Sequence, residues 1–267
     1  MKTRAITGFF FIAVLIGAVL LGSYAFVPFF SLVAACCVYE FYRMVHTEHT
    51  KPLVGLGVAV AALGLSLLGA VLLGFLPPAI LALGIMAVLL LYIAALFRKT
   101  VHPIQDVAYS LIGIISAAIP FMFFMALGFV ADSYEAYIPL GFLILLWTND
   151  TGAYLAGRSM GRRKLFERIS PNKTWEGFIG GVLLAVVAAV ILSHYFGILP
   201  LWCWVGMALI VGIFGTLGDL VESMLKRNLG VKDSGNILPG HGGLLDRFDG
   251  LLMAAPFVYL FLRFVIT

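Results

Sequence analysis

The sequence predicts an all-α polytopic integral membrane protein, with about nine transmembrane helices and a cytoplasmic N-terminus. Three observations carry this prediction: an apolar composition, regularly spaced apolar runs, and basic residues confined to alternate loops. Of the 267 residues, 62% are hydrophobic and only 11% are charged, whereas soluble chains average roughly 45–50% apolar and about 25% charged residues. So little polar surface excludes a water-soluble fold.

Nine apolar runs are long enough to be spans, since a helix needs about 20 residues to cross ~30 Å of hydrocarbon. They are separated by turn-forming pairs such as Gly22-Ser23, Pro77-Pro78 and Leu199-Pro200. The first two are short and closely spaced, so eight or ten spans remain alternatives. The predicted spans are residues 5–21, 24–41, 53–75, 78–97, 107–130, 137–155, 177–196, 201–221 and 251–266.

The basic residues predict the orientation of these spans. With the N-terminus in the cytoplasm, 16 of the 17 Lys and Arg residues fall on the cytoplasmic side, and only Arg263 does not. This is the asymmetry of the positive-inside rule. It places the polar loops 157–176 and 226–250 on the cytoplasmic face, where nucleotides are found.

Two features of the chain have ordinary explanations. The first apolar run follows Lys2 and Arg4 and resembles a signal peptide, but the apolar sequence continues to residue 42, so we expect a retained span. Cys36, Cys37 and Cys203 lie in apolar stretches without metal-ligand spacing, and we expect small core residues.

Acidic residues within or beside the spans mark the candidate site, because ionisable groups are costly there and usually functional. For Glu40, Asp106 and Glu176 we expect an interfacial position, with snorkelling or a nearby Lys or Arg partner. Asp150 and Asp219 lie instead in polar stretches within spans. Helical spacing allows one face of a helix to carry Asp219, Glu222, Ser223, Lys226 and Arg227.

The loop 232–250 adds carboxylates, cations and a compact turn. Its glycines and Pro239 favour a turn whose backbone N–H groups face an anion. Asp246 and Asp249 are three residues apart and would project from one helical turn. Converging carboxylates suit Mg²⁺, and the nearby basic residues suit phosphate groups. This mixture is typical of a nucleotide-triphosphate site.

These residues resemble the signature of phosphatidate cytidylyltransferases, also called CDP-diacylglycerol synthases. The resemblance rests on residues 223–227 (SMLKR), 232–235 (KDSG) and 238–249 (LPGHGGLLDRFD), without departure from the family signature. Residues 149–154 (NDTGAY) and 170–177 (SPNKTWEG) are also similar to the family. The match covers the C-terminal half well, whereas the first 130 residues match only in being several spans.

The resemblance implies transfer of CMP from CTP to phosphatidate in phospholipid biosynthesis, giving CDP-diacylglycerol and pyrophosphate. It implies Mg²⁺ as cofactor, with a second cation left open, and CTP, phosphatidate and the lipid bilayer as partners. It also implies a homodimer in a bacterial inner membrane, with the active site facing the cytoplasm. No nucleic-acid partner is expected. Residues 1–130 would form an N-terminal region of about five spans, and residues 131–267 the catalytic region of about four.

Charge neutralisation and positioning should dominate the reaction, because two polyanions must meet. Asn172 is as well explained by capping the following helix at Thr174, and His241 by shaping its loop. The metal ligands assigned are Asp219, Asp246 and Asp249; the phosphate-neutralising catalytic residues are Lys173, Lys226, Arg227 and Arg247; and the substrate-binding residues are Asp150, Asn172, Ser223, Lys232 and His241.

Two other functions are compatible with parts of the pattern. A CTP-dependent lipid-alcohol kinase would transfer the γ-phosphoryl group instead, but the long glycine-rich loop favours the cytidylyltransferase. A cation-coupled transporter would use Asp150 and Asp219 as ion ligands. Transporters of that kind show repeated halves, whereas the polar residues here gather in one half and no repeat is visible.

Overall fold

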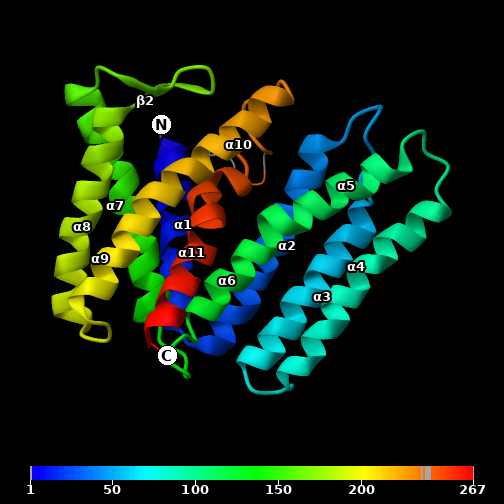
Figure 1. The fold of residues 1–267 in the computed structure, drawn as a ribbon, viewed down its shortest axis with the longest axis horizontal. Coiled ribbons are helices and arrows are strands. Elements are labelled where there is room, and N and C mark those ends of the chain that lie inside the picture. Colours follow the sequence, from blue (N-terminus) through cyan, green and yellow to red (C-terminus); the bar gives the residue numbers. More distant parts are fainter. Residues whose placement is uncertain (1, 236, 238–241, 267) are drawn as a thin grey trace. The chain divides into compact units, whose positions relative to one another are not determined.

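A computed structural model describes residues 2–235, 237 and 242–266, with side chains from residue 8 onward. It is mostly helical, as the sequence predicts (Figure 1). The chain divides into two compact units. Unit 1 comprises Met1–Met125 and Asp233–Arg247, and unit 2 comprises Ala126–Lys232 and Phe248–Thr267. Each unit is described by itself.

Unit 1 is built from the N-terminal helices together with a returning loop from the C-terminal part of the chain. Its aromatic core joins two helices, since Phe30 lies 4.9 Å from Phe26 and 4.8 Å from Phe124 between ring centroids. All three rings are fully buried. The elements are α1 (Lys2–Leu20), α2 (Ser23–Val45), α3 (Val54–Leu72), η1 (Pro78–Ile80), α4 (Leu81–Leu96), α5 (Pro103–Gly113), the π-helical η2 (Ile114–Ala118), α6 (Ile119–Leu127, whose last two residues belong to unit 2) and η4 (Leu245–Arg247).

Unit 2 contains four long helical segments and a short hairpin. The helices α7 and α8 pack along their lengths (Figure 1). The elements are α7 (Tyr137–Met160), β1 (Lys164–Phe166), β2 (Ser170–Thr174), α8 (Trp175–Phe196), α9 (Leu201–Ile210), the π-helical η3 (Val211–Gly215), α10 (Thr216–Asn228) and α11 (Asp249–Ile266).

Small residues allow α7 and α8 to approach each other closely. A Cβ atom at Gly152 would lie 2.9 Å from the Leu184 Cβ and 3.1 Å from the Gly181 Cα. A Cβ at Gly181 would lie 2.7 Å from the Asn149 carbonyl oxygen. Helix pairs in membranes associate through such small residues, because lipid supplies no hydrophobic drive for helices to pack.

Seven helical segments among the described residues are long and apolar enough to cross a membrane. They correspond to seven of the nine predicted spans, so the coarse prediction of a helical membrane protein is supported. The other two predicted spans are also helical. The described apolar part of α1 is Gly8–Leu20, and α7 carries Thr148, Asn149, Asp150 and Arg158, which lower its hydropathy.

One element was not expected from the sequence. Within the predicted polar loop 157–176, β1 and β2 form an antiparallel pair with Lys164 opposite Thr174 and Phe166 opposite Ser170. The Trp175 backbone N–H donates to the Arg163 carbonyl at 2.9 Å, which continues the pairing to the start of α8. The described residues are thus mostly helical, as the predicted all-α fold class requires, and this short hairpin is an unpredicted addition.

Two of the three acidic residues expected at the interface are instead deeply buried. Glu40 is 2% exposed and accepts backbone and hydroxyl hydrogen bonds, so its carboxylate does not snorkel to the surface as expected. Asp106 is 1% exposed and lies 3.9 Å from Arg98, which is the expected basic partner. Glu176 accepts hydrogen bonds from the Arg162 and Arg163 backbone N–H groups and so ties the hairpin to α8.

Candidate active site

The helix α10 presents a polar face at its second turn, as its i,i+4 spacing predicts. The Ser223 hydroxyl donates to Asp219 Oδ1 at 3.1 Å. One turn further, Lys226 Nζ lies 3.1 Å from Glu222 Oε1. Both pairs are helix neighbours. The helix itself therefore holds the Ser223 hydroxyl against the Asp219 carboxylate.

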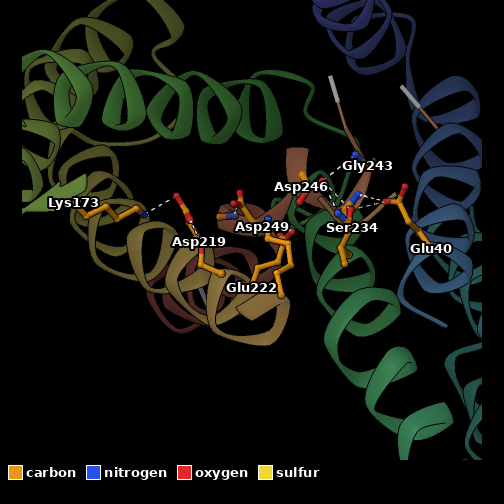
Figure 2. Close-up of polar contacts among 12 residues, drawn as sticks. Glu40, Lys173, Asp219, Glu222, Ser234, Gly243, Asp246 and Asp249 are labelled. Carbon is orange, nitrogen blue, oxygen red and sulfur yellow. Dashed lines mark hydrogen bonds and ion pairs between the residues drawn. The ribbon is translucent and has the colours of Figure 1, made fainter. Parts of the chain in front are cut away.

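Lys173 reaches the same carboxylate from the hairpin. It lies in β2, and its Nζ is 2.6 Å from Asp219 Oδ2 (Figure 2). The Lys173 side chain is 25% exposed and the Asp219 side chain 41%, so the ion pair is open to solvent on one side. Thr174 fixes the adjoining helix start, because its Oγ1 accepts the Gly177 N–H at 3.1 Å. The cap of α8 is therefore Thr174 itself, and the alternative that Asn172 caps this helix is wrong.

Glycines allow α11 to approach α10 closely, so that the Asp249 side chain lies near Asp219. A Cβ at Gly218 would collide with the Asp249 carbonyl oxygen, and a Cβ at Gly250 would lie 3.4 Å from the Gly215 carbonyl oxygen. Asp249 is the first residue of α11, and its Oδ1 accepts the Gly250 N–H at 2.7 Å. A carboxylate is favoured at a helix N-terminus by the exposed N–H groups.

Asp150 of α7 completes a group of three carboxylates and one lysine within unit 2. Asp249 interacts electrostatically with Asp219, Asp150 and Lys173. Asp150 in turn interacts electrostatically with Asp219 and Lys173. We call Asp150, Lys173, Asp219 and Asp249 the carboxylate cluster. The sequence placed Asp150 among the substrate-binding residues and paired it with Asp219 only under the transporter alternative.

The cluster is not a ready-made metal cage. Within the described parts of the chain, no three His, Cys, Asp or Glu side chains converge closely enough to form one. The carboxylates of the cluster are near enough to interact, and Lys173 is the cation in contact with one of them.

Asp246 belongs to unit 1 and has a different set of contacts. Its Oδ2 accepts the backbone N–H of Ser234 at 2.9 Å, the Ser234 hydroxyl at 3.0 Å and the backbone N–H of Gly243 at 2.9 Å. Figure 2 shows these bonds beside Glu40 of α2. The structure thus gives Asp246 a role in shaping its own loop, in addition to the ligand role that the sequence predicts.

The remaining predicted site residues lie mostly at the surface. Exposed side chains are those of Asn172, Arg227, Lys232 and Arg247. Such positions leave cationic groups accessible to a phosphate-bearing ligand. His241 lies outside the described residues.

Glu40 is the polar residue that sequence reasoning misjudged. It sits in the mostly apolar helix α2, and its partners Ser234 and Leu245 are 194 and 205 residues away along the chain. The available signal was the cost of a carboxylate within a predicted span.

Comparison with known proteins supports the resemblance seen in the sequence. The sequence model of the cytidylyltransferase family matches residues 2–265 of this chain. A phosphatidate cytidylyltransferase of Bacillus subtilis (strain 168) is 41% identical over 181 residues, which are 67% of this chain and 67% of that protein. Proteins of the same name from Staphylococcus aureus (strain COL) and Staphylococcus haemolyticus (strain JCSC1435) are each 45% identical over 159 residues, or 59% of this chain and 60% of theirs. The family match extends over nearly all of the sequence, and the chain therefore belongs to the cytidylyltransferase family.

Proposed function

We propose that this chain transfers CMP from CTP to phosphatidate, giving CDP-diacylglycerol and pyrophosphate for phospholipid synthesis. The observation that carries the proposal is the carboxylate cluster, in which Lys173 Nζ lies 2.6 Å from Asp219 beside Asp150 and Asp249. Carboxylates carried by apolar helices, together with a lysine from the adjoining hairpin, suit a polyphosphate substrate that meets a lipid substrate. The relatives named above carry the same activity in their names.

The bond changes need no strong general base. A phosphate oxygen of phosphatidate attacks the α-phosphorus of CTP, and the bond from that phosphorus to the bridging oxygen of pyrophosphate breaks. The attacking phosphomonoester is already mostly dianionic at pH 7, because its second pKa is about 6. The chain's task is therefore to bring two polyanions together and to hold them in line.

In this proposal, basic residues neutralise the phosphate charges of the two substrates. Lys173 already faces a carboxylate of the cluster, so a phosphate oxygen arriving there would meet a positioned cation. We assign phosphate neutralisation to Lys173, Lys226, Arg227 and Arg247, and substrate contacts to Asp150, Asn172, Ser223, Lys232 and His241.

Mg²⁺ fits the chemistry of the donors. It prefers carboxylate oxygens and keeps several waters, so it does not require a closed protein cage. We assign Asp219, Asp246 and Asp249 to hold it. Asp219 and Asp249 are supported by their mutual proximity, and the assignment of Asp246 rests on its place in the family signature. When bound, the ion would neutralise the phosphate oxygens of the nucleotide.

We further propose an inner-membrane location with the polar loops facing the cytoplasm, and a homodimeric state. The one-sided distribution of Lys and Arg supports the orientation. The bacterial relatives support the choice of membrane. The homodimer rests on the family resemblance.

The proposal is tested with detergent-purified protein, phosphatidate, Mg²⁺, and CTP labelled at the α or the γ phosphate in separate reactions. We expect α label to enter the lipid fraction while γ label leaves as pyrophosphate. Chelation of Mg²⁺ should abolish both. Entry of γ label into lipid in a parallel reaction with a lipid alcohol in place of phosphatidate would instead establish a kinase, and incorporation of neither label would contradict both enzyme functions.

A further inference from the structure

The buried carboxylate of Glu40 holds residues that lie about 200 positions further along the chain. Its Oε2 accepts the backbone N–H of Leu245 at 2.7 Å and the hydroxyl of Ser234 at 3.1 Å (Figure 2). Glu40 is 2% exposed. All three residues belong to unit 1, whose second segment, Asp233–Arg247, we call the signature loop.

Two glycines of the signature loop fit closely around this carboxylate. A Cβ at Gly235 would collide with Glu40 Oε1 and lie 2.7 Å from its Cδ. A Cβ at Gly243 would collide with the Ser234 hydroxyl and lie 2.7 Å from Glu40 Oε2. Real Cβ atoms essentially never approach this closely, so a side chain at either position would displace the Glu40 carboxylate or the Ser234 hydroxyl. The backbone of the loop is therefore shaped around Glu40.

Ser234 links Glu40 to Asp246. Its hydroxyl oxygen is 3.1 Å from Glu40 Oε2 and 3.0 Å from Asp246 Oδ2, and Asp246 also accepts the backbone N–H groups of Ser234 and Gly243. A serine hydroxyl has one hydrogen to donate, so the two carboxylates share it. The position of the Asp246 side chain is thus coupled to Glu40 through a single hydroxyl group.

A buried carboxylate is costly unless hydrogen bonds compensate it. The signature loop donates two hydrogen bonds to Glu40 Oε2, and these bonds anchor the loop to α2. Among its described residues, regular structure is confined to the short helix η4 (Leu245–Arg247). Its conformation therefore depends on a few specific contacts, of which the bond from Leu245 to Glu40 lies at the first residue of η4.

We propose that Glu40 is a positioning residue for the transfer reaction, a role that rests on the proposed function. It holds the signature loop through Leu245 and Ser234, so that Asp246 and Arg247 are presented to the substrates. It acts on the loop and does not touch the substrate.

The test compares two substitutions of equal length, Glu40→Gln and Glu40→Met. Glutamine keeps an oxygen that accepts the Leu245 N–H, whereas methionine fills the same space without an acceptor. Hydrogen exchange is measured on peptides covering residues 242–250 in detergent without substrate, and CDP-diacylglycerol formation is measured separately. We expect Glu40→Met to exchange at least about tenfold faster and to lose about tenfold or more of the rate, since the Leu245 N–H and the Ser234 hydroxyl lose a buried acceptor. Glu40→Gln should recover most of both.

Asp106 provides the matched control. It is also a buried carboxylate of unit 1, 1% exposed, and its Oδ1 accepts the Lys51 N–H at 2.7 Å. Asp106→Asn and Asp106→Leu repeat the same comparison at a site with no described bond to the signature loop. They should leave exchange over residues 242–250 unchanged. If Glu40→Met does not fold, Ser234→Ala removes the shared hydroxyl and should also accelerate that exchange.

Three results would overturn the proposal: wild-type exchange in both Glu40→Met and Ser234→Ala, equal losses in Glu40→Met and Glu40→Gln, or the same acceleration in Asp106→Leu. The exchange measurement needs no catalytic activity. If wild-type protein formed no CDP-diacylglycerol but the exchange pattern held, the proposed function would fail while the anchoring of the loop by Glu40 would stand.

Discussion

At the residue scale, Lys173 is the basic member of the carboxylate cluster, and its Nζ lies 2.6 Å from Asp219 Oδ2. We expect Lys173→Met to lower the rate of CDP-diacylglycerol formation by about 100-fold or more, because a positioned cation is lost where charge must be neutralised. Steady-state rates with labelled CTP check this. Lys99→Met, which removes an exposed lysine of unit 1, should stay within about twofold of wild type. Equal rates for Lys173→Met and wild type would remove Lys173 from the site.

Individual site residues were predictable where the signal was local. Asp219 and Ser223 are four residues apart on one helix, and the structure pairs them as the spacing predicts. The sequence also named Lys173, but only through family resemblance, since its contact with Asp219 depends on an unexpected hairpin. Glu40 was misjudged because its partners Ser234 and Leu245 are about 200 residues away in the sequence.

At the element scale, the helices were predictable because apolar runs and turn-forming residues set their bounds. The predicted span 177–196 corresponds to α8 (Trp175–Phe196), and 137–155 lies within α7 (Tyr137–Met160). The hairpin was missed because β1 and β2 have three and five residues and carry no apolar alternation. Their pairing is completed by tertiary contacts of Glu176 with Arg162 and Arg163.

The start of α8 depends on the Thr174 cap. Thr174→Ala removes the acceptor of the Gly177 N–H and should lower the free energy of unfolding by about 1 kcal/mol. Thr174→Ser keeps a hydroxyl acceptor and should lose less than half of that. Unfolding in mixed detergent micelles, followed by helical circular dichroism, measures both. Equal stability of the alanine variant and wild type would show that the bond contributes nothing there.

The contact between α7 and α8 should not tolerate a larger residue at Gly181. An added Cβ would lie 2.7 Å from the Asn149 carbonyl and 2.9 Å from its side-chain oxygen. We expect Gly181→Ala to destabilise the fold by about 1–3 kcal/mol and to lower activity, because Asn149 directly precedes Asp150 of the cluster in α7. Gly55→Ala, where an added Cβ meets nothing within 4 Å, is the matched control and should unfold no more easily than wild type. Equal effects of the two substitutions would contradict this account of the contact.

At the scale of the whole molecule, the nine spans predicted from the sequence and the distribution of basic residues together predict a specific topology. The N-terminus should lie in the cytoplasm and the C-terminus on the opposite side. Each end is tested with two fusions. Alkaline phosphatase is active only outside the cytoplasm, and the fluorescent protein is fluorescent only inside it. A phosphatase fusion at the C-terminus should be active. An inactive phosphatase fusion at the C-terminus, together with a fluorescent fusion at the same end, would place both termini in the cytoplasm and require an even number of spans.

The central claim is that the carboxylate cluster supports nucleotidyl transfer to a lipid. The most direct measurement is incorporation of α-labelled CTP into phosphatidate by wild type, Asp219→Asn and Asp249→Asn, with Asp132→Asn as control because its carboxylate is 97% exposed. We predict transfer by wild type and Asp132→Asn, and losses of about 1,000-fold or more in the two cluster variants. Absence of transfer by folded wild type, or wild-type rates in both cluster variants, would contradict the account.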